Sequence, residues 1–72
     1  MLDYTPFFQM LEERGLNQYK ILKMNMINNS LLDKLKHNQN INLLTLEQLC
    51  KNFDCKMTDI VRFTEENQKN NP

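Results

Sequence analysis

Polar and basic side chains concentrate in the middle of this 72-residue chain, and they are residue types that contact nucleic acids. Residues 17–42 carry a net charge of +3, whereas segments 1–16 and 43–72 carry −2 and −1. Lysine pairs with phosphates, and asparagine, which occurs eleven times in the chain, pairs with adenine edges. These residue types suit a surface that contacts nucleic acid. An ordinary solvated surface explains a net charge of three equally well.

The remaining reactive side chains form no catalytic or metal-binding constellation. One histidine (His37) and two cysteines (Cys50 and Cys55) cannot supply the four ligands of a structural zinc site without carboxylates. No paired carboxylates, Ser–His or Cys–His arrangement, or glycine-rich phosphate loop occurs at a plausible spacing. We therefore expect no enzyme, no metal, no cofactor and no small-molecule ligand, and we interpret His37 as a helix-end residue.

The composition is that of one small globular domain. The chain is 40% hydrophobic and 25% charged with a formal net charge of zero, which is too apolar for a disordered protein. No apolar run approaches the roughly 18 residues that cross a bilayer, and residues 1–6 do not resemble a signal peptide. We expect a cytoplasmic protein with reduced thiols and no membrane partner. A Cys50–Cys55 disulfide requires a helix that ends sharply, and a cytosolic setting disfavours it.

The scarcity of turn residues predicts an all-helical chain, because there are only one glycine and two prolines. Apolar residues at helical spacing and asparagine or threonine caps divide it into five helices. The expected helices cover residues 6–14, 18–24, 29–37, 43–53 and a short segment after Thr58. The expected N-caps are Thr5, Asn17, Asn28, Asn42 and Thr58. The expected core consists of Phe7, Leu11, Ile21, Ile27, Leu32, Leu35, Leu46, Leu49 and Ile60.

The order and spacing of these segments resemble a known family. Residues 17–23 (NQYKILK) and 27–35 (INNSLLDKL) are similar to the helix-turn-helix of the phage Cro and repressor (XRE-type) family. Residues 37–40 (HNQN), 43–55 (LLTLEQLCKNFDC) and 57–61 (MTDIV) resemble the loop and the last two helices that follow. The likeness covers residues 4–63 and is closest to minimal single-domain transcriptional regulators.

The resemblance implies an all-α fold, a compact five-helix bundle of the lambda-repressor-like DNA-binding type. Helices 2 and 3 would form the helix-turn-helix, with helix 3 in the major groove of double-stranded DNA. Residues 1–63 would form the domain and residues 64–72 a disordered polar tail. Two departures concern the helix-turn-helix itself, because Leu22 replaces a small residue and Met26 replaces the turn glycine. Either Asn25 takes the left-handed turn position or the turn is built differently. Asn38 replaces a glycine in the loop after helix 3.

The resemblance also implies roles for individual residues. The base-reading candidates are Asn29, Ser30, Asp33 and Lys34. The phosphate-binding candidates are Gln18, Asn28, Lys36, Asn38 and Asn40. Asp33 would accept from cytosine or orient Lys34. Three residues of helix 2 leave two alternatives open: they either lie near the DNA backbone or only cover the surface of the helix. They are Tyr19, Lys20 and Lys23.

The leading hypothesis is a sequence-specific transcriptional regulator, a repressor that binds operator DNA as a homodimer. The C-terminal helix would form the dimer interface, with Val61 and Phe63 as candidate contacts. The alternative is a protein-interaction module of antitoxin or anti-repressor type that keeps the fold with weak or no DNA binding. Neutral net charge, the altered turn and the absence of arginine from helix 3 favour this alternative slightly.

Overall fold

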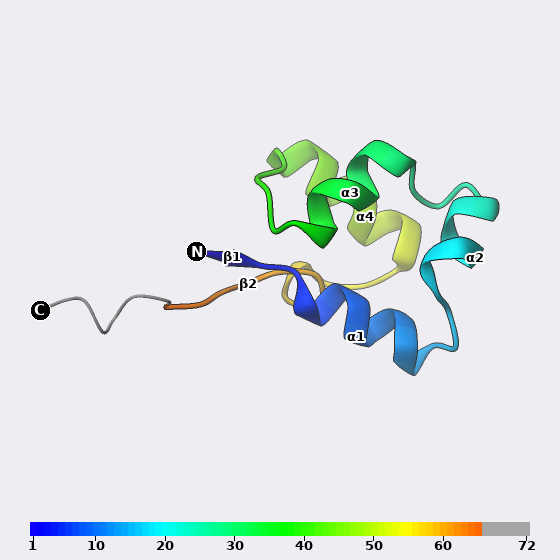
Figure 1. Cartoon of the computed structure of the whole chain (residues 1–72), viewed down its shortest axis with the longest axis horizontal. Helices are drawn as coiled ribbons and strands as arrows, with labels where there is room; N and C mark the ends of the chain where they lie inside the picture. Colours follow the sequence, from blue (N-terminus) through cyan, green and yellow to red (C-terminus); the bar gives the residue numbers. More distant parts are fainter. Residues whose placement is uncertain (66–72) are drawn as a thin grey trace, which may run out of the picture.

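A computed structural model describes residues 1–65 as four α-helices and a small two-stranded sheet (Figure 1). Helices α2 and α3 follow α1 in the chain, and α4 is the longest helix (Figure 1). The elements are β1 (Leu2–Asp3), α1 (Thr5–Glu13), α2 (Gln18–Lys23), α3 (Asn29–Lys36), α4 (Leu43–Phe53), the 3₁₀ turn η1 (Met57–Asp59) and β2 (Arg62–Phe63). Within residues 1–65 no helix is long and apolar enough to cross a bilayer.

The core lies between the four helices, and all nine residues expected in it are buried. Three further side chains complete it: Tyr4, Met10 and Phe53. The Phe7 ring packs edge-on against the Phe53 ring with centroids 5.3 Å apart, which joins α1 to the end of α4. Leu22, in place of the small residue typical of the resembled family, is half-buried against this core.

Three asparagine caps begin three of the helices, as the sequence predicts. The Oδ1 atoms of Asn17, Asn28 and Asn42 accept the backbone N–H three residues later at 2.8, 2.8 and 2.7 Å. Each of these bonds satisfies a donor that the first helical turn leaves free. The prediction for Thr5 is wrong, because Thr5 already belongs to α1 and its hydroxyl donates to Asp3 Oδ1 at 2.6 Å. Asp3 Oδ1 also accepts the Thr5 N–H at 3.0 Å, so Asp3 supplies the polar contact at this helix start.

The predicted fifth helix is absent from the described structure. Only η1 is helical there, and β2 pairs antiparallel with β1, with Leu2 opposite Phe63 and Asp3 opposite Arg62. An isolated helix of this length is marginal, whereas β1 offers the same residues backbone partners across a sheet. The ion pair between Arg62 Nε and Asp3 Oδ2, at 2.7 Å, strengthens the pairing. Residues 1–65 are therefore mostly helical, with four α-helices rather than the five expected.

The pairing of the chain ends continues one residue beyond β2. The Met1 amino group donates to Thr64 O at 2.7 Å, and Thr64 N–H donates to Met1 O at 2.9 Å. Thr64 was expected to open the disordered tail, and here it extends the contact between the two ends. Glu65, the next residue of the expected tail, is exposed, and residues 66–72 lie outside the described residues.

Candidate nucleic-acid interface

The residues predicted to read bases lie on one exposed face of α3. Asn29, Ser30, Asp33 and Lys34 are exposed, while Leu32 and Leu35 on the opposite face are almost fully buried. Among residues 1–65, no side chain is hydrogen-bonded to those of Asn29, Ser30 or Lys34. The helix is thus anchored by its leucines and offers its amide, hydroxyl and ammonium groups to solvent.

The turn before α3 is built around Asn25. Its φ of 60° is left-handed, whereas Met26, which stands where the resembled family has glycine, has no positive φ, so the left-handed turn residue is Asn25. Met26 is half-buried against the core. The side-chain amide of Asn52 on α4 donates to Met26 O at 3.2 Å. This bond connects α4 to the turn that sets the orientation of α3.

A hollow beside α3 brings base-reading and phosphate candidates together. Its volume is about 420 Å³. Ser30, Lys34, Asn28 and Asn40 line it together with Leu31, Ile41, Asn42 and Thr45. Four of the predicted site residues therefore share one polar depression between α3 and the start of α4.

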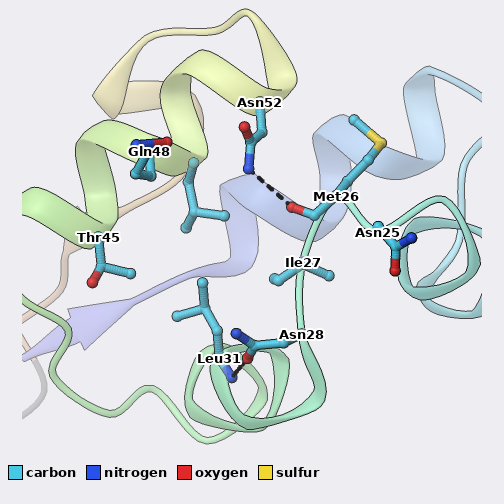
Figure 2. Close-up of a pocket in the computed structure, with 9 residues that line it drawn as sticks. Asn25, Met26, Ile27, Asn28, Leu31, Thr45, Gln48 and Asn52 are labelled. Atoms are coloured by element: carbon cyan, nitrogen blue, oxygen red, sulfur yellow. Dashed lines mark hydrogen bonds between the residues drawn. The ribbon is translucent and has the colours of Figure 1, made fainter.

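A second hollow, of about 380 Å³, lies between the turn and α4 (Figure 2). Thr45, Gln48 and Asn52 of α4 line one side of it, and residues 25–28 line the other. Asn28, Leu31 and Thr45 line both hollows, so the two adjoin. The site-lining residues Thr45, Gln48 and Asn52 were missed in the sequence, although their i, i+3, i+7 spacing marks one polar stripe on a helix.

The phosphate candidates are exposed but do not gather at one point. Gln18 is the first residue of α2, and Lys36 is the last residue of α3. Asn38 has a left-handed φ of 53°, as expected for its loop position, and its Oδ1 accepts Tyr4 N–H at 3.0 Å. Asn38 therefore holds the loop after α3 against the start of α1. The side-chain NH2 group of Asn38 is the part that remains to donate to a phosphate.

Two of the alternatives left open by the sequence concern Asp33 and the surface of α2. Asp33 lies beside His37, with Oδ1 and Nδ1 3.4 Å apart, rather than beside Lys34, and its backbone oxygen is 2.9 Å from the same ring nitrogen. On α2, Lys23 Nζ lies 5.4 Å from the centre of the Tyr19 ring and donates to its hydroxyl at 3.3 Å. Lys20 Nζ donates to Gly15 O at 3.2 Å.

Val61 and Phe63 border an apolar groove of about 640 Å³. Phe63 is 82% exposed, and Leu43, which also lines the groove, is 78% exposed. Asn40 and Ile41 line this groove and also the polar hollow beside α3. The apolar groove therefore begins where the polar surface ends. The remaining lining residues are Leu2, Tyr4, Leu46, Met57, Thr58 and Arg62.

Comparison with known proteins gives two matches in agreement with this geometry. A family model described as the Cro/C1-type helix-turn-helix DNA-binding domain matches residues 8–66, which confirms the resemblance found in the sequence. A crystal structure of the transcriptional regulator VanUg superposes with a TM-score of 0.77 and 23% identity, covering 90% of this chain and 87% of that chain. This likeness establishes the shared fold. No curated protein sequence matches the chain.

Proposed function

Because this chain belongs to the Cro/C1-type helix-turn-helix DNA-binding family, we propose that it is a sequence-specific repressor that binds operator DNA as a homodimer. Helix α3 would lie in the major groove, and its exposed residues would contact base edges. The observation that carries the proposal is the two-faced character of α3. Leu32 and Leu35 fix the helix in the core, while Asn29, Ser30 and Lys34 have no side-chain partner among residues 1–65.

The chemistry of that exposed face suits base recognition. The Asn29 side chain can pair with adenine through a donor and an acceptor, and Lys34 can donate to guanine or to a phosphate. Asp33 is a candidate acceptor for the amino group of cytosine. The absence of arginine from α3 implies a modest specificity for each half-site, which makes a second copy necessary.

The exposed phosphate candidates flank α3 along the chain. Gln18 and Asn28 come before α3, Lys36 is its last residue, and Asn38 and Asn40 follow it. Backbone contacts of this kind set the register and orientation of a protein on the duplex without reading its sequence. The positive charge of residues 17–42 supplies the attraction that makes such binding depend on salt.

The apolar groove is the surface that we assign to a second copy of the chain. Phe63 projects from β2 at the edge of the groove, so one molecule carries both a protruding ring and an apolar groove that can receive its counterpart. A two-fold interface needs this kind of self-complementary surface. Because the groove adjoins the hollow beside α3, pairing there would hold two copies of α3 together for half-sites about 34 Å apart. Repression would follow from occupation of the promoter.

Fluorescence anisotropy of labelled duplexes at several salt concentrations tests the proposal. The duplexes are the promoter upstream of the chain's own gene and a mixed sequence of equal length. We expect tighter binding to the promoter. We also expect log K to fall with log salt with a negative slope of several units, about −0.9 for each neutralised phosphate. In a Lys34→Ala, Lys36→Ala variant the magnitude of this slope should fall by about 2.

A matched control removes two exposed lysines outside the basic segment, Lys51→Ala and Lys56→Ala, with the same change of net charge. Equal losses in both variants would contradict an interface centred on α3. A folded protein that binds neither duplex at micromolar concentration and low salt would contradict DNA binding altogether. The protein-interaction module would then be the better account of this fold.

A further inference from the structure

The two cysteines stand at a sharp end of α4. Asp54 has φ 50° and ψ 59°, which turns the chain left-handed directly after the helix. Its N–H donates to Lys51 O at 3.3 Å, and Cys55 N–H donates to Cys50 O at 3.0 Å. This pair of bonds is the Schellman motif, in which the residue after the left-handed position folds back onto the last helical turn. The motif therefore places Cys55 against Cys50.

Side-chain facts agree with this placement. Both cysteines are free thiols, both are half-buried, and both pack against the core. Burial raises the pKa of the Cys55 thiol to about 11, and the neighbouring Cys50 adds to the rise by its charge and by a side-chain hydrogen bond. In most Schellman motifs an apolar contact joins these two positions. Here two thiols occupy them.

We propose that Cys50 and Cys55 form a dithiol that closes reversibly to an intramolecular disulfide by exchange with a low-molecular-weight disulfide. A disulfide requires two Cβ atoms that face each other on closely spaced backbone positions, and the Schellman turn brings these two backbone positions together. The site is independent of the DNA-binding proposal, because none of the groups assigned to DNA takes part in it.

The exchange proceeds in two balanced steps, written here for oxidised glutathione. The Cys50 thiolate attacks one glutathione sulfur, the glutathione S–S bond breaks, and the departing glutathione thiolate takes up the proton that Cys50 released. Cys55 then loses its proton to solvent and attacks Cys50 Sγ, which displaces the second glutathione as a thiol. Two protein thiols are oxidised and one glutathione disulfide is reduced to two thiols. Burial raises the pKa of the Cys55 thiol, which favours Cys50 as the first nucleophile.

The ring that closes contains the residues that attach α4 to its neighbours. Asn52 donates to Met26 O in the turn before α3, and the Arg14 guanidinium on the α1 side donates to Phe53 O and Asp54 O. A disulfide between Cys50 and Cys55 would restrain these contacts in the folded state. It would also lower the conformational entropy of the unfolded chain. We expect oxidation to raise Tm by about 5–10 °C.

The test incubates the purified full chain in glutathione buffers of increasing oxidised fraction, quenches with an alkylating maleimide, and records the intact mass and Tm. We expect a monomeric product that has lost two hydrogens, accepts no maleimide, and returns to two alkylated thiols with reductant. The Cys50→Ser and Cys55→Ser variants are matched controls, because neither can close the disulfide. Cys55→Ser should stop at one glutathione bound to Cys50, whereas Cys50→Ser should take up glutathione more slowly.

Three outcomes overturn the proposal. The first is two alkylated thiols in every buffer. The second is a stable glutathione adduct on the unsubstituted chain, and the third is a disulfide-linked dimer. An oxidised monomer with an unchanged or lower Tm would overturn the inference that the native turn already suits the bond. A second pair of variants, Cys50→Ala and Cys55→Ala, keeps the test valid if a serine variant fails to fold.

Discussion

The Tyr4 hydroxyl donates to the backbone oxygen of Gln39 at 2.6 Å and ties the start of α1 to the loop after α3. Tyr4 is 2% exposed, and burial raises the pKa of its phenol, which therefore stays protonated as a donor. In the same place Asn38 Oδ1 accepts Tyr4 N–H at 3.0 Å. Residues far apart in the chain thus set the position of a loop that we assign to DNA phosphates.

Removal of this hydroxyl in Tyr4→Phe should lower the free energy of unfolding by about 1 kcal/mol, because the ring stays packed and one partly buried carbonyl loses its donor. Urea unfolding followed by circular dichroism measures the change. Tyr19→Phe is the control, since that ring is 68% exposed and its loss of a hydroxyl should leave the unfolding midpoint unchanged. Equal midpoints for Tyr4→Phe and the unsubstituted chain would show that this bond contributes nothing.

The turn before α3 gives a second stability prediction. Asn25 holds a left-handed φ of 60°, which costs alanine roughly 1–2 kcal/mol and costs glycine very little. Asn25→Ala should therefore lower the free energy of unfolding by about 1 kcal/mol, and Asn25→Gly should not lower it. Met26→Gly, which restores glycine at the family position, should lower stability because Met26 has no positive φ and is packed on the core. A stabilising Met26→Gly would contradict this assignment of the turn.

The helices and the exposed face of α3 were predictable because they depend on local signals. Asn17, Asn28 and Asn42 are caps whose side chains bond three residues ahead, so short spacing alone identifies them. The exposed face of α3 follows from the 3.6-residue period that buries Leu32 and Leu35.

The end of the domain was not predictable in the same way, because its structure depends on distant partners. Residues 60–63 have an apolar pattern that suits a short helix, and only the strand at Leu2–Asp3 makes the extended form better. Tyr4 was missed from the core for a similar reason, since its hydroxyl needs the Gln39 carbonyl before burial is tolerable. The dimer assignment changes accordingly, from a C-terminal helix to the groove beside Val61 and Phe63.

Acid should weaken the contact between the two ends of the domain. Hydrogen bonds from Thr5 and then from Arg62 lower the pKa of Asp3 from 3.8 to about 2. Because the pKa of Asp3 is lower in the folded than in the unfolded chain, its ionised carboxylate stabilises the folded state. This stabilisation is complete above about pH 5 and is lost as the pH falls through about 2. Asp3→Asn should lower the free energy of unfolding by about 1 kcal/mol at pH 6.

Urea titrations of the unsubstituted chain and of Asp3→Asn at several pH values measure this difference. The two curves should approach each other as the pH falls from 5 to 2, whereas Glu47→Gln, the same charge change at an exposed α4 position, should run parallel to the unsubstituted chain. A difference that stays constant down to pH 2 would mean that the Asp3 charge is not the cause.

The dimer proposal predicts that a charge at Phe63 weakens the dimer, whereas a charge at Leu44, which is also apolar and exposed, does not. Phe63→Glu would place a charge in the groove and should raise the dimer dissociation constant by about 100-fold, because an unpaired charge in an apolar contact is costly. Leu44→Glu is the matched control, since Leu44 is 70% exposed on α4 but does not line the groove. Sedimentation equilibrium at several concentrations measures both variants. An equal effect, or a monomeric unsubstituted chain at high concentration, would reject this groove as the interface.

Base reading and phosphate binding should separate in two single variants. Asn29 is exposed at the first turn of α3, so Asn29→Ala should leave the fold intact. We expect it to cost about 1–3 kcal/mol on the preferred duplex and to relax the preference at one base pair, because its amide would pair with one adenine. Lys36→Ala should instead weaken all duplexes alike and lower the salt slope by about 1. Affinities for duplexes substituted at single positions measure both effects, and a uniform loss in Asn29→Ala would assign Asn29 to the backbone rather than to a base.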